Sequence, residues 1–240
     1  MKKIVLAAVI SISVLSCKKE VTFEYKHADK PATITCENVD AKLLSEAYYA
    51  FENAILIQAK NTNRRPNTNI TPENALKNFI ARSRGNIRIT DYVTEESFVV
   101  FNTLKGLGIW NGPQLKNDAT ITECIGNEIS NPVIKGSFNT LRSVESLSPK
   151  LMVSAMTDNR AIRDQYKDKA LMTYVALDMY YAKFFNTDFS AVTFLTEQVK
   201  PTVTPTIKTA PKAPQIGKAL DLDVKKKKTA AHGPHDGHNH

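Results

Sequence analysis

Residues 166–185 read YKDKALMTYVALDMYYAKFF, and this stretch decides the fold class. Its apolar side chains recur at spacings of four and three residues, at Tyr166, Ala170, Tyr174, Leu177, Tyr181 and Phe184. That period places them on one face of a helix. We therefore expect a long helix over about 159–185, with this face in the centre of a bundle.

The preceding sequence repeats the helical pattern several times. Leu44, Tyr48, Phe51 and Ile55 share one face of an expected first helix. Helix starts with a cap followed by proline occur at Thr71-Pro72, Asn131-Pro132 and Ser148-Pro149. Two further starts are expected, at Thr94, with Val93 and Phe98 as a hydrophobic staple, and at Asp118. The sequence predicts an all-α bundle of six or seven helices covering 37–190.

The first residues have the features of an export signal. Lys2 and Lys3 precede an apolar run over 4–15, which is shorter than the roughly 20 residues of a membrane-spanning helix. The sequence Val14-Leu15-Ser16-Cys17 resembles the lipobox of bacterial lipoproteins. The resemblance implies that 1–16 is a signal peptide and that Cys17 carries the lipid. The alternative is an ordinary secretory signal with a chance cysteine.

The lipid on Cys17 implies a protein anchored to a membrane without spanning it, because two or more acyl chains hold a protein stably. Residues 16–20, SCKKE, also resemble the start of lipoproteins from Bacteroidota. We expect a cell-envelope location, at the outer rather than the inner membrane. Residues 17–36 would form the lipidated cysteine and an extended tether.

Residues 191–240 are predicted to form a disordered, Pro- and Lys-rich tail. The chain carries a net charge of +8, yet 17–196 holds 22 basic against 20 acidic residues. A nucleic-acid partner is not expected, because it needs a basic patch on a folded face. The tail ends in His232, His235, His238 and His240, which could gather around Zn²⁺, Cu²⁺ or Ni²⁺. The alternatives are a low-complexity tail without function and residues left from cloning.

Three cysteines are present, at 17, 36 and 124. With Cys17 acylated, Cys36 and Cys124 are the pair expected to form a disulfide in an oxidising compartment. The alternative is two buried thiols too far apart to bond.

Catalytic residues are scarce in the expected helical domain. It contains no histidine between Glu37 and Lys200, which excludes a histidine-based triad or a His-ligated zinc hydrolase within 37–190. Glu96-Ser97 resembles the Glu-Ser pair of lytic transglycosylases, but Gly106-Leu107-Gly108-Ile109 only faintly matches the segment that follows in that family. Trp110, in a Gly-rich turn, is the candidate ligand contact.

Three functions remain open at this stage. The preferred one is a non-enzymatic module that binds an envelope protein or the cell wall. The second is binding or buffering of a transition metal through the histidine tail. The third is a peptidoglycan-acting enzyme that uses a carboxylate such as Glu96.

Overall fold

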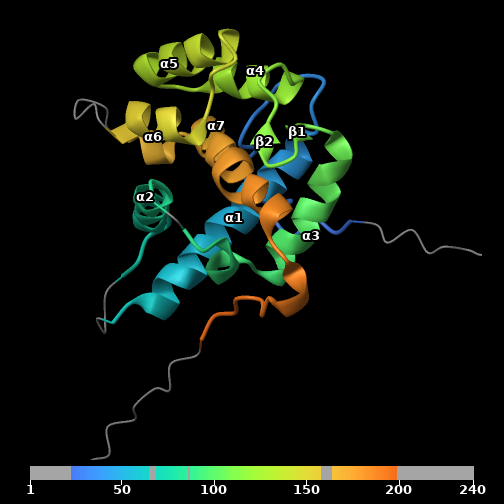
Figure 1. Cartoon of the computed structure of the whole chain (residues 1–240), viewed down its shortest axis with the longest axis vertical. Helices are drawn as coiled ribbons and strands as arrows, with labels where there is room; N and C mark the ends of the chain where they lie inside the picture. The colour runs from blue at the N-terminus through green and yellow to red at the C-terminus, as the bar shows by residue number, and fades with distance from the viewer. Residues whose placement is uncertain (1–22, 65–68, 86, 158–163, 199–240) are drawn as a thin grey trace, which may run out of the picture. The chain divides into compact units, whose positions relative to one another are not determined.

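The computed structural model describes residues 23–64, 69–85, 87–157 and 164–198. Within these ranges the chain forms seven α-helices and one short hairpin, which confirms the all-α class (Figure 1). By its contacts the chain divides into Met1–Val199 and Lys200–His240, and every described residue belongs to the first unit. Cys17 and the four tail histidines lie outside the described residues.

Seven α-helices follow one another along the described part of the chain. They are α1 Ala41–Thr62, α2 Pro72–Ser83, α3 Glu95–Leu104, α4 Thr120–Glu128, α5 Pro132–Ser143, α6 Pro149–Thr157 and α7 Lys169–Tyr174. A π-helical turn, Val175–Tyr180, and a 3-10 turn, Tyr181–Asn186, continue α7 directly. Strands β1 (Trp110–Asn111) and β2 (Gln114–Leu115) pair antiparallel, and Gly112 adopts a φ of 57° in the turn between them.

Most expected helix starts are confirmed by capping contacts. Thr71 and Asn131 accept backbone N–H groups with their side chains and are followed by proline at the first helical positions of α2 and α5. At α3 the side chains of Thr94 and Ser97 each accept the other residue's backbone N–H. This reciprocal capping box satisfies two backbone donors that the helix itself leaves unpaired.

Two expected boundaries were wrong. The N-cap of α4 is Ala119 rather than Asp118, and no side chain caps that helix. The last helix starts at Lys169 rather than near 159, because Asp164 has a left-handed φ of 61° and the Asp168 side chain accepts the Leu171 N–H as an N-cap. Tyr166 accordingly lies half-buried in a separate 3-10 turn.

The core forms where α1 crosses α7 and its continuation (Figure 1). The Tyr181 hydroxyl donates to the Ala47 carbonyl of α1 at 3.0 Å, and the rings of Phe51 and Tyr180 lie 5.0 Å apart. The Tyr180 hydroxyl contacts Ser97 of α3 at 2.8 Å. Buried tyrosines therefore fill the core and at the same time satisfy polar groups on neighbouring elements.

Both ends of the described chain pack against the bundle beyond the expected domain of 37–190. On the N-terminal side, Ile34 is fully buried and the Thr33 backbone N–H donates to Ser45 of α1, so 23–36 is not simply an extended tether. On the C-terminal side, the Leu195 N–H donates to the Val93 carbonyl at 2.7 Å. The packed part of the chain therefore includes residues on both sides of 37–190. Within the described residues, no helix combines the length and apolar character needed to cross a bilayer.

Candidate functional site

A cleft of about 530 Å³ lies between the C-terminal half of α1 and the face of α2 beside it. Amide side chains dominate its walls, at Gln58, Asn63, Asn69, Asn74 and Asn78. An amide offers both donors and an acceptor, so these walls can bond hydroxyl, carbonyl and amide groups alike. The cleft is therefore suited to a ligand rich in oxygen and nitrogen.

The floor and rim of this cleft add apolar surface and positive charge. Ile55, Phe79 and Tyr92 form the buried side, and Lys77 and Arg82 are exposed at the rim. Arg82 donates to the Tyr92 hydroxyl at 3.5 Å, which holds its guanidinium over the cleft. No carboxylate, imidazole or thiol is among the described lining residues. The lining can thus attract and hold an anionic ligand.

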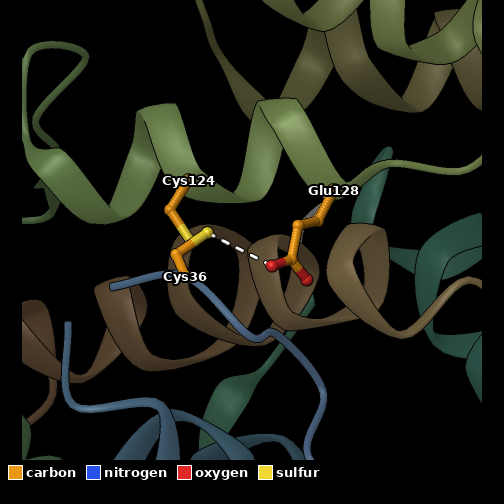
Figure 2. A group of neighbouring side chains, drawn as sticks. All are labelled: Cys36, Cys124 and Glu128. Atoms are coloured by element: carbon orange, nitrogen blue, oxygen red, sulfur yellow. Dashed lines mark hydrogen bonds between the residues drawn. A yellow bond between two sulfur atoms is a disulfide. The ribbon is translucent and has the colours of Figure 1, made fainter. Parts of the chain in front are cut away.

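Cys36 and Cys124 form the expected disulfide, with their Cα atoms 5.9 Å apart (Figure 2). Glu128, one turn further along α4, lies beside it, and its Oε1 accepts from the Thr35 N–H at 2.8 Å and hydroxyl at 2.7 Å. The same oxygen is 3.3 Å from the Cys36 sulfur. A disulfide sulfur has no proton to donate, so the disulfide and Glu128 form a clamp between the N-terminal segment and α4 rather than a thiolate metal site.

Trp110 does not contact solvent as the sequence suggested. Only 7% of it is exposed, and the centroid of its ring lies 6.2 Å from that of Phe101 and 5.6 Å from that of Phe185. Its indole N–H donates to the Leu177 carbonyl at 3.2 Å, inside the π-helical turn. Trp110 therefore packs the hairpin against the continuation of α7, and the expectation of a ligand contact is corrected.

Glu96 occupies the first turn of α3, as its sequence position indicated. Its carboxylate is largely buried, and Oε1 lies 2.9 Å from Nε2 of His27. The sequence placed His27 in the tether, outside the helical domain, so this pairing was missed. Residues 37–190 contain no histidine, but the fold packs His27 of the preceding segment against Glu96 within that range.

Among the described residues, groups of three His, Cys, Asp or Glu side chains with their ligand atoms close together occur in two places, the disulfide clamp and the surroundings of His27. The cleft between α1 and α2 was also missed, although its asparagine-rich lining is visible in the sequence over 63–78. Amide-rich segments are equally typical of loops, so composition by itself could not identify a cleft. No protein-family model, no curated protein and no solved structure matches this chain.

Proposed function

We propose that this protein is a lipid-anchored cell-envelope protein whose helical domain binds a polar, anionic envelope component in the cleft between α1 and α2. The observation that carries the proposal is the lining of that cleft. It presents amides and two cations, Lys77 and Arg82, over an apolar floor.

The ligand class follows from this chemistry. Amide donors and acceptors match the hydroxyl and acetamido groups of a glycan, and the rim cations match its carboxylates. Cell-wall glycan strands with their acidic side groups combine these features. Turnover is not part of the proposal, since Glu96, the carboxylate that resembled a catalytic one, is held against His27 and does not line the cleft.

Anchoring is proposed from the N-terminal sequence, with Cys17 as the acylated residue. The disulfide between Cys36 and Cys124 supports export, because such bonds persist in oxidising compartments. Growth with an alkyne-labelled fatty acid should label the wild-type protein. A Cys17→Ala variant should lose both the label and its place in the membrane fraction; a labelled variant would refute the assignment of the lipid to Cys17.

Ligand binding is tested by co-sedimentation of the mature protein with purified cell-wall sacculi. We expect Lys77→Ala with Arg82→Ala to reduce the apparent affinity about tenfold, as loss of two charge-assisted contacts would. The control is Arg88→Ala with Lys150→Ala, which removes two exposed cations outside the cleft. The tail is the same in both proteins, so nonspecific attraction to its lysines affects them equally. Equal binding by the two variants would refute the cleft as the binding site.

A further inference from the structure

Three side chains from separate segments converge beside the N-terminal half of α1. They are His27 of the N-terminal segment, Glu46 of α1 and Glu96 of α3. Their nitrogen and oxygen ligand atoms all lie within 4.8 Å of one another. Glu46 is almost fully buried, and the side chains of His27 and Glu96 are 14% and 12% exposed.

The contact between His27 and Glu96 has the distance of an ion pair but not the direction of a hydrogen bond. Nε2 and Oε1 are 2.9 Å apart, and both atoms are buried without a hydrogen-bond partner. The lone pair of Nε2, or a proton on it, points along a single direction in the ring plane, and that direction passes to one side of Oε1, because a hydrogen bond requires a nearly straight arrangement. A cation placed along that direction could contact both atoms.

A metal ion satisfies the same geometry. Ligand atoms separated by 2.9 Å subtend an angle of about 90° at an ion about 2.1 Å from each, an ordinary metal–ligand distance for imidazole and carboxylate. Two ligands on opposite sides of such an ion are about 4.2 Å apart, and the ligand atoms of the three side chains lie within 4.8 Å of one another.

The surrounding contacts hold the carboxylates in place for this role. Glu46 accepts the backbone N–H groups of Lys26 and His27 at 2.8 and 2.9 Å, one on each oxygen. Each oxygen keeps a second lone pair for a cation. Asn53 donates to Oε2 of Glu96 at 3.3 Å and leaves Oε1 directed at His27. Contacts of this kind orient the ligands of metal sites.

We propose that His27, Glu46 and Glu96 bind a divalent first-row transition metal, with Zn²⁺ and Mn²⁺ as the ions that suit one imidazole and two carboxylates. The charge of such an ion balances the two carboxylates, which are costly to bury without cations. Because His27 lies ten residues after Cys17 in the sequence, the ion would fasten the N-terminal segment around His27 to α1 and α3. The three residues are not among those that line the cleft.

The test is calorimetric titration of Zn²⁺ into the full mature chain in which His232, His235, His238 and His240 are replaced by Gln, so that the tail cannot compete. We expect one equivalent to bind, and His27→Gln or Glu96→Gln to weaken binding at least tenfold. The matched control is Glu52→Gln. Glu52 is a half-buried glutamate of α1 that pairs with Lys169 and is not part of the proposed site. Zinc affinity unchanged by His27→Gln would overturn the proposal.

A second measurement covers the case in which the His27 variant does not fold. Crystals of the wild-type protein grown with Zn²⁺ should show an anomalous peak at the zinc edge between Nε2 of His27 and Oε1 of Glu96. A map with no peak at that position overturns the proposal and leaves the pair as an ion pair that fastens the N-terminal segment. Zn²⁺ in hundredfold excess over its dissociation constant should also raise the melting temperature by about 5–10 °C.

Discussion

Replacing Asp178 by Asn should change how the stability of this protein depends on pH. Asp178 lies in the π-helical turn after α7, and only 6% of it is exposed. Burial raises the pKa of its carboxyl group to about 6, although the Tyr174 hydroxyl, the Leu115 backbone and the Lys183 charge act in the opposite direction. The Tyr174 hydroxyl donates to Oδ2 at 2.5 Å.

The sign and size of the effect follow from these values. An unfolded Asp has a pKa near 4, so the folded protein binds this proton more tightly than the unfolded chain does. The stabilisation from the neutral carboxyl is therefore complete below about pH 4 and is lost as pH rises through about 6. The difference between the two pKa values corresponds to about 3 kcal/mol of unfolding free energy.

Urea unfolding of the wild-type protein and Asp178→Asn, measured from pH 4 to pH 8, tests this reasoning. The variant keeps an oxygen acceptor for Tyr174 but cannot ionise, so its stability relative to wild type should rise by about 3 kcal/mol across that range. Taking the difference cancels the other titrating groups. A difference that stays constant with pH would refute the account. Tyr174→Phe should move the pH-dependent loss of wild-type stability to higher pH, because it removes a hydrogen bond that favours the charged form of the Asp178 carboxyl group.

Four further changes have expected outcomes in thermal or urea unfolding. Replacing both Cys36 and Cys124 by Ser should lower the free energy of unfolding by about 4–5 kcal/mol, because the bond spans 88 residues and restricts the unfolded chain. Reduction of the wild-type protein should lower it by the same amount. A decrease of less than about 1 kcal/mol would contradict this prediction. Gly126→Ala should be clearly destabilising, since its Cβ would lie 2.3 Å from Asn139 Oδ1, whereas Gly136→Ala has open space and should gain about 0.5–1 kcal/mol. Thr94→Ala should cost about 1 kcal/mol by removing the α3 cap, and Thr94→Ser should restore most of it. Trp110→Phe should cost about 1–3 kcal/mol by leaving the Leu177 carbonyl without its indole donor, and a neutral result would argue against the buried position of Trp110.

Helix starts are the features that the sequence predicted best. Thr71, Thr94 and Asn131 each cap a helix through contacts within three residues of chain, so a short stretch of sequence contains the whole interaction. The α1 face of Leu44, Tyr48, Phe51 and Ile55 is buried for a similar reason, because the helical period brings these side chains together without reference to the rest of the fold.

Two of the failures involve contacts between distant segments, and the third is local. His27 resembled part of an extended tether, yet it lies against Glu96, 69 positions later in the numbering. Trp110 resembled an exposed loop residue, but Leu177 of the distant π-helical turn accepts its N–H and buries it. The start of the last helix was placed too early because the apolar period continues through Tyr166, whereas the left-handed Asp164 and the Asp168 cap interrupt the helix.

The sequence by itself determined the all-α class, through local helical periodicity, and it predicted the disulfide between Cys36 and Cys124. Only the tertiary structure decided that these two cysteines are close enough to bond, that α1 and α2 enclose an amide-lined cleft, and that His27 lies beside Glu46 and Glu96. The physical reason is the range of the interactions. Capping and helical periodicity act within one or two turns of chain, whereas a cleft or a cluster of ligands depends on how separate segments pack in space.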